Sequence, residues 1–128
     1  MNNSLHRILL VLIFYVSTIS MFSQNVVMTN GTVNLCSGTF LDPGGTGPYP
    51  AFSNTQFTIC PNGSGLIQLN FTSFDVEAGW DFLTVYDGPN TTSPTLGTYD
   101  NNVPLLGTVG ATANNTSGCL TFVFSSDF

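Results

Sequence analysis

The clearest pattern in this chain is an alternation of apolar and polar residues within Leu66–Phe74. Ile67, Leu69 and Phe71 share one side of an extended backbone, and the residues between them are polar. Cys119–Ser125 repeats the pattern, with large apolar residues at every second position. An alternation with a period of two predicts β-strands that bury one face in a core.

Other stretches rich in β-branched and aromatic residues predict further strands, and turn-forming residues separate them. These stretches are Asn25–Leu35, Thr55–Cys60, Asp81–Tyr86, Leu96–Tyr99 and Gly107–Ala111. No segment shows a helical period of useful length. We therefore predict an all-β fold of about eight strands, an antiparallel two-sheet sandwich that forms one domain over residues 24–128. The predicted core contains Phe57, Ile59, Ile67, Leu69, Phe71, Leu83, Val85, Leu120 and Phe122.

Residues 1–23 differ in character from the rest of the chain. Arg7 ends a short polar start, Ile8–Val16 is an uncharged apolar run, and smaller, more polar residues follow up to Ser23. This order is typical of a secretory signal peptide, so we expect a secreted or cell-surface protein. The apolar run is shorter than the roughly 20 residues that span a bilayer, so we predict no membrane insertion after signal removal.

Removal of the signal leaves no cationic side chain, because Arg7 is the only Lys or Arg of the chain and His6 is its only His. All seven carboxylates remain. Nucleic acid is excluded as a partner, because nothing would neutralise its phosphates. Catalytic triads and Cys–His pairs need a histidine, so we predict that the protein is not an enzyme.

Four of the seven carboxylates, Asp75, Glu77, Asp81 and Asp87, crowd into Phe74–Gly88. Oxygen ligands suit Ca²⁺, so one interpretation of this stretch is a site for a hard cation. The other interpretation is a solvated acidic loop, which is common at protein surfaces. The residues alone leave both interpretations open.

Three cysteines, Cys36, Cys60 and Cys119, lie in the predicted domain. Export favours disulfide formation. An odd number leaves one thiol free or paired outside the domain.

Taken together, these motifs resemble the CUB domain family over Cys36–Phe128. Phe74–Glu77 followed by Asp81–Gly88 is similar to the central signature of the family, and Ser126–Phe128 resembles its late Ser-Asp element. Loops such as Asn114–Cys119 resemble those of CUB modules from secreted bacterial proteins of the Bacteroidetes type. The resemblance implies a CUB-like jelly roll.

Calcium-binding members of the family use one glutamate and two aspartates, which fall here on Glu77, Asp81 and Asp127. The resemblance therefore implies a Ca²⁺ site at these carboxylates, with Asp75 as a supporting acid. It also implies that the site meets a basic group presented by an extracellular protein or a glycan.

The resemblance further implies a disulfide between Cys36 and Cys60. The positions of a second family disulfide hold Ala78 and Leu96, so that bridge is not expected. The family continues with one more strand after the position of Phe128. We therefore expect the last strand to be missing, and Cys119 to stay free or to pair beyond the chain end.

These features predict a secreted or cell-surface, non-catalytic module for Ca²⁺-dependent recognition of a protein or glycan, with a role in adhesion. Two alternatives stay open. The chain could be an accessory domain of a secreted hydrolase whose catalytic part lies beyond Phe128, or it could be a structural spacer.

Overall fold

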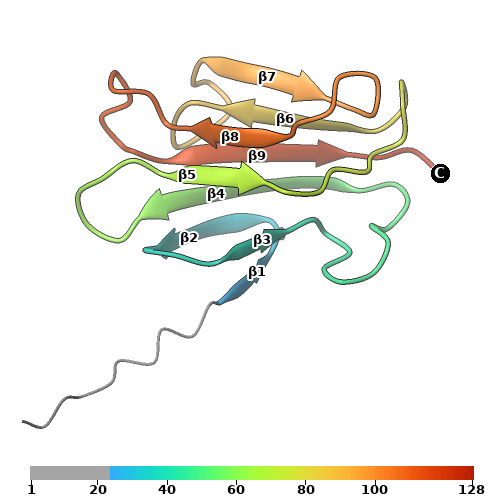
Figure 1. Cartoon of the computed structure of the whole chain (residues 1–128), viewed down its shortest axis with the longest axis horizontal. Coiled ribbons are helices and arrows are strands. Elements are labelled where there is room, and N and C mark those ends of the chain that lie inside the picture. The colour runs from blue at the N-terminus through green and yellow to red at the C-terminus, as the bar shows by residue number, and fades with distance from the viewer. Residues whose placement is uncertain (1–23) are drawn as a thin grey trace, which may run out of the picture.

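The computed structural model describes residues 24–128, and the signal peptide predicted for residues 1–23 lies outside them. Within the described residues the chain forms nine strands and no helix, so it has no helix able to cross a membrane there (Figure 1). The strands are β1 (Asn25–Val27), β2 (Gly31–Leu35), β3 (Thr39–Leu41), β4 (Asn54–Pro61), β5 (Gln68–Phe71), β6 (Phe82–Tyr86), β7 (Thr95–Tyr99), β8 (Gly107–Gly110) and β9 (Leu120–Ser125). The all-β prediction is confirmed. The weak region expected over Asn25–Leu35 divides into β1 and β2, and β3 had not been predicted.

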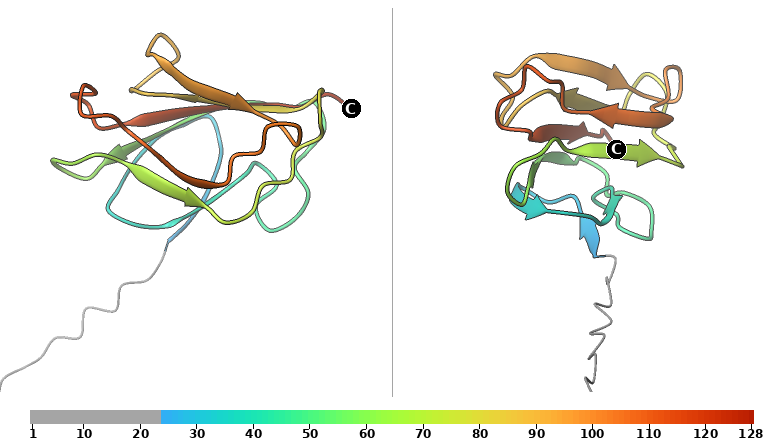
Figure 2. Two further views of the ribbon diagram at one scale, coloured as in Figure 1. Left: turned by 45° about the horizontal axis from the view of Figure 1, so that its top comes forward. Right: turned by 60° about the vertical axis from the view of Figure 1, so that its left-hand side comes forward.

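The strands form the two layers of a sandwich, seen from other sides in Figure 2. One layer is a five-stranded sheet with the order β2-β4-β9-β6-β7. The other consists of two separate pairs, β1-β3 and β5-β8. The pairs β1-β3 and β2-β4 are parallel and the other four are antiparallel, so the sheets are mixed rather than wholly antiparallel.

Strand β9 lies at the centre of the large sheet and supplies much of the core. Its residue Phe122 pairs with Phe57 of β4 on one side and with Val85 of β6 on the other. All three side chains are buried, and full burial of each stabilises the fold by about 1.5–3 kcal/mol. The predicted core residues are all buried or packed partly buried against the core. The core also contains four residues that no alternating pattern had predicted, namely Val26, Met28, Val76 and Leu105.

The second layer is divided by a groove of about 620 Å³ between β3 and β5. Apolar side chains from both layers line it, among them Phe40, Leu69, Phe71 and Phe124. Within residues 24–128, β3 pairs only with β1, and β5 pairs only with β8. Each of the two strands therefore has one edge without a strand partner, on the two sides of the groove. The expectation that a last strand is missing stays a prediction.

The predicted disulfide between Cys36 and Cys60 is wrong. Cys60 is bonded to Cys119 with 4.1 Å between their Cα atoms, and Cys36 is an exposed free thiol. The reason is the register of β4 and β9, which places Ile59 opposite Leu120 and so brings the next pair, Cys60 and Cys119, together. A bridge across 59 residues stabilises the fold by about 4 kcal/mol. The expectation that Cys119 stays free or pairs beyond the chain end is also wrong.

Candidate metal centre

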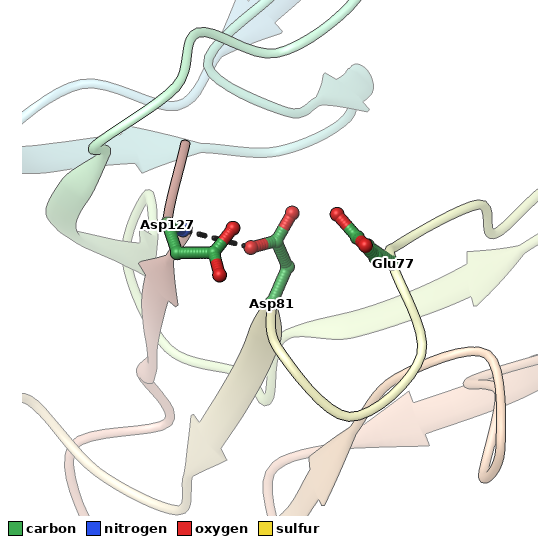
Figure 3. A group of neighbouring side chains, drawn as sticks. All are labelled: Glu77, Asp81 and Asp127. Carbon is green, nitrogen blue, oxygen red and sulfur yellow. Dashed lines mark hydrogen bonds between the residues drawn. The ribbon is translucent and has the colours of Figure 1, made fainter.

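Three carboxylates, those of Glu77, Asp81 and Asp127, meet at one end of the sandwich. One carboxylate oxygen from each lies within 4.8 Å of the other two. Figure 3 shows the three side chains turned toward one another, Glu77 and Asp81 from one loop and Asp127 from the segment after β9. Asp81 is buried, Asp127 is half-buried and Glu77 is exposed, so the cluster opens to solvent on the Glu77 side.

The register of the large sheet brings Asp81 and Asp127 together. Asp81 immediately precedes β6 and Asp127 follows β9, and these neighbouring strands pair Phe82 with Ser125. The backbone N–H of Asp127 then donates to Asp81 Oδ1 across 2.9 Å, as the dashed line in Figure 3 shows. Two carboxylates that are 46 residues apart are thus fixed side by side.

A tight turn adds Glu77 to the cluster. The backbone N–H of Asp81 donates to the carbonyl of Glu77 across 3.2 Å and closes the turn. Within the turn, Gly79 has a φ of 81°, which a residue without Cβ adopts at little cost. The N–H of Gly79 donates to Asp100 Oδ2 across 2.7 Å, which fixes the turn to the loop after β7.

Tyr49 forms hydrogen bonds with both Asp81 and Glu77, and no sequence pattern had predicted it as a site residue. Its hydroxyl donates to Asp81 Oδ2 across 2.6 Å and accepts the backbone N–H of Glu77 across 3.1 Å. Its ring packs against Phe124, with 4.9 Å between the ring centroids. Partial burial, together with the hydrogen bond to Asp81, raises the pKa of Tyr49 above its ordinary value of 10.0. Tyr49 therefore stays protonated and serves as a donor at neutral pH.

Asp75 and Asp100 do not belong to the cluster of three carboxylates, but their hydrogen bonds order the loops around it. Asp75 accepts a hydrogen bond from Asn101 Nδ2 across 2.8 Å, and Asn101 Oδ1 accepts the N–H of Val76. Burial alone would raise the pKa of Asp100, but hydrogen bonds from Gly79 and from the turn after Asp100 outweigh it and lower that pKa. Asp75 thus orders the approach to Glu77 and is not one of the three clustered carboxylates.

The donor set fits a hard divalent cation. Ca²⁺ takes six to eight oxygen ligands, and carboxylates are its usual protein donors. Each Asp81 oxygen accepts one protein hydrogen bond and keeps a second lone pair. The set contains neither His nor Cys, the residues that select zinc.

Electrostatics also favours a cation at this place. Three carboxylates this close repel one another by about 1–3 kcal/mol per pair if all are charged. Residues 24–128 contain no Lys, Arg or His that could offset this repulsion. A cation bound among the three oxygens would replace the repulsion with attraction.

The fold agrees with the comparison to known families. Residues 30–127 match the model of the CUB domain, and the chain belongs to the CUB domain family.

Among curated proteins, the chain is similar to human cubilin and to human CUB and zona pellucida-like domain-containing protein 1. It is 32% identical to cubilin over 83 residues, which are 61% of this chain and 2% of cubilin. It is 31% identical to the second protein over 113 residues, which are 84% of this chain and 18% of that protein. The chain thus spans only a small part of each relative.

Proposed function

We propose that residues 24–128 form a secreted or cell-surface, non-catalytic binding module that holds Ca²⁺ at Glu77, Asp81 and Asp127. The observation that carries this proposal is the convergence of three carboxylates in a domain that has no cationic side chain. The disulfide between Cys60 and Cys119 supports an oxidising, extracellular location. The small share of each relative that the chain covers supports a role as one module of a longer protein.

The proposed partner presents a basic group, either a Lys or Arg of a protein or an amino group of a glycan. A domain whose only charged side chains are acidic attracts such a group and cannot supply it itself. Exposed aromatic residues adjoin the cluster and support a contact surface there. Trp80, 65% exposed, directly precedes Asp81, and an aromatic face attracts cations.

Phe52 is the second exposed aromatic residue beside the cluster. It is 75% exposed, and its backbone N–H donates to the carbonyl of Asp127. Its φ of 57° lies in the left-handed region, which a bulky residue rarely adopts. Strained positions of this kind cluster at binding sites, which supports a role for Phe52 in partner contact.

Calorimetric titration with Ca²⁺ tests the proposal directly. We expect a single site in the wild-type protein and a loss of binding in Glu77→Gln, which removes one charge from an exposed side chain. Asp42→Asn is the matched control, because Asp42 is also exposed but lies outside the cluster. The control should bind like wild type. Absence of Ca²⁺ heat at millimolar metal, or equal loss in both variants, would contradict the assignment.

A further inference from the structure

The loop between β4 and β5 carries an Asn-Gly pair, Asn62-Gly63, at the surface of the domain. The tip of this loop is exposed, and Figure 1 shows the loop projecting beyond the ends of its two strands. Backbone bonds hold the loop only where it begins and ends. The N–H of Asn62 donates to the carbonyl of Leu35 across 3.1 Å, and the N–H of Ile67 donates to the carbonyl of Gly118 across 2.9 Å. Between these two bonds, neither the Asn62 side chain nor the Gly63 N–H has a hydrogen-bond partner among residues 24–128.

Asn62 and Gly63 are placed to react with each other. Asparagine is one of the chemically labile residues of proteins, because the backbone nitrogen of the next residue can attack its side-chain carbonyl carbon and close a five-membered ring. A following glycine favours this step, since it has no side chain to shield its nitrogen and its backbone turns freely. Apart from its chain neighbours, no atom lies within 4 Å of the position that a Cβ would take on Gly63, and its φ is 104°. Both groups that form the ring are therefore accessible.

The other Asn-Gly pair of the chain, Asn30-Gly31, is restrained by the fold. Asn30 Oδ1 accepts the backbone N–H of Gln56 across 2.8 Å. Gly31 begins β2 and pairs with Phe57 of β4. Ring closure at Asn30 therefore requires that its side chain leave Gln56 and that the start of β2 separate from β4. The two pairs have the same residues and differ in how the structure holds them.

We propose that Asn62 is a site of spontaneous deamidation, which converts it to isoaspartate and aspartate in the folded protein. The backbone nitrogen of Gly63 loses its proton and bonds to Cγ of Asn62, and the bond from Cγ to Nδ2 breaks as ammonia leaves. Water then opens the succinimide ring. Attack on the backbone carbonyl carbon of residue 62 gives isoaspartate, and attack on Cγ gives aspartate. The net reaction consumes water and releases ammonia, and it needs no enzyme, oxidant or reductant.

The reaction changes the charge and the chain path far from the acidic cluster. Strands β4 and β9 are antiparallel, so the loop after β4 lies at the end of the sheet opposite Asp127 (Figure 1). The product adds a carboxylate to the seven of the chain. Isoaspartate also adds a methylene to the main chain, inside a loop whose two anchoring bonds, at the N–H groups of Asn62 and Ile67, stay in place. The modified protein therefore retains its fold, and it accumulates with age because water alone does not restore the amide.

Peptide mapping of the full-length protein, kept in mildly alkaline buffer made with heavy-oxygen water, tests the proposal. Cleavage before aspartate places Asn30 and Asn62 on different peptides, because Asp42 lies between them, and mass spectrometry detects the heavy oxygen at each converted residue. In the folded protein we expect Asn62 to convert roughly tenfold faster than Asn30, because a hydrogen bond and a strand pairing must open first at Asn30. In urea that unfolds the chain, the two rates should be similar. Equal rates in the folded protein, or no conversion of Asn62 there while the unfolded chain converts, would overturn the proposal.

Two matched variants assign the reaction to this loop. Asn62→Gln should remove most of the released ammonia and of the acidic form seen on isoelectric focusing, because a glutamine side chain would have to close a larger ring. Asn30→Gln replaces an asparagine that is also exposed and also precedes glycine, and it should leave both readouts unchanged. Circular dichroism checks that both variants are folded. Equal losses in the two folded variants, or unchanged ammonia release from Asn62→Gln, would overturn the proposal.

Discussion

The hydroxyl of Tyr49 donates to Asp81 Oδ2 across 2.6 Å, although 32 residues separate the two in the chain. The hydroxyl oxygen of Tyr49 in turn accepts the backbone N–H of Glu77, so one phenol orders two of the three clustered acids. The loop before β4 is thereby tied to the entrance of β6.

Replacing Tyr49 with phenylalanine removes the hydrogen bonds of the hydroxyl and leaves the aromatic ring in place. Tyr49→Phe retains the ring against Phe124 but leaves Asp81 Oδ2 and the N–H of Glu77 without this partner. We expect the free energy of unfolding in urea to fall by about 1–2 kcal/mol and the Ca²⁺ affinity to weaken. Tyr86→Phe, in β6 and outside the cluster, is the control. Equal losses of Ca²⁺ affinity in both variants would contradict the role assigned to Tyr49.

Because the pKa of Tyr49 is raised, the hydrogen bonds of its hydroxyl stabilise the fold up to alkaline pH and are lost above it. A group whose pKa is higher in the folded state contributes stability at low pH and loses it as the pH rises through the folded pKa. The contribution of Tyr49 is therefore complete below pH 10.0 and declines above it. Absorbance titration should show a phenol in the wild-type protein that ionises late, and Tyr49→Phe should remove it. A titration unchanged by the substitution would show that another tyrosine ionises late.

Partner binding is expected to depend on both calcium and salt. A lysine-rich peptide immobilised on a sensor surface should bind the Ca²⁺-loaded protein and release it on addition of a chelator. Rising salt should weaken binding, because the contact joins charges of opposite sign. The same peptide with acetylated lysines is the control. Equal binding of both peptides would argue against recognition of a basic group.

The protonation of Asp87 is expected to make the free energy of unfolding depend on pH in the acidic range. It accepts hydrogen bonds from Thr112 N–H, Thr112 Oγ1 and Asn115 Nδ2. Burial alone would raise its pKa, but these bonds outweigh that effect and hold the pKa below the ordinary value of 3.8. A lowered pKa contributes stability above pH 3.8 that is lost as the pH falls through the folded pKa.

Asp87→Asn tests this dependence in urea unfolding. At neutral pH the variant should be less stable than wild type by about 1 kcal/mol, because it loses charge-assisted hydrogen bonds. The difference should shrink below pH 3.8, where wild-type Asp87 takes up a proton as it unfolds. If the variant were less stable than wild type by the same amount at every pH, the loss would come from packing and not from the charge of Asp87.

The groove between β3 and β5 supports the prediction of one further strand. A strand placed there would pair with both unpartnered edges and cover the apolar walls at Phe40 and Phe71. A form of the protein extended past Phe128 by a segment with the apolar–polar alternation of a β-strand is therefore expected to melt at a higher temperature. A form extended by Gly and Ser alone is the control, and equal melting temperatures would contradict this prediction.

The strands with regular alternation could be predicted from the sequence. β6 buries every second residue, and β9 buries its alternating apolar residues together with Thr121. The alternation predicted Leu83, Val85, Leu120 and Phe122 correctly. Val26 and Leu105 join the core from short or irregular segments, where no period exists to find them. The parallel pairing of β1 with β3 depends on contacts distant in sequence, which local pattern does not contain.

The site was predictable only in part. Family resemblance pointed to Glu77, Asp81 and Asp127, which the structure brings together. Tyr49 lies in a Gly/Pro loop and carries no local signal of its contact with Asp81. The disulfide depends on which residue of β4 lies opposite Cys119, and only the register of the sheet decides that.

The central position of β9 has a mechanical consequence. Antiparallel ladders bind it to β4 on one side and to β6 on the other. A load applied at the Asp127 end, along the strand, must shear both ladders together instead of peeling one bond after another. The bond from Cys119 to Cys60 anchors the opposite end of the strand and prevents it from sliding out. A pull on this end of the domain is therefore opposed by both ladders and by the disulfide at the same time.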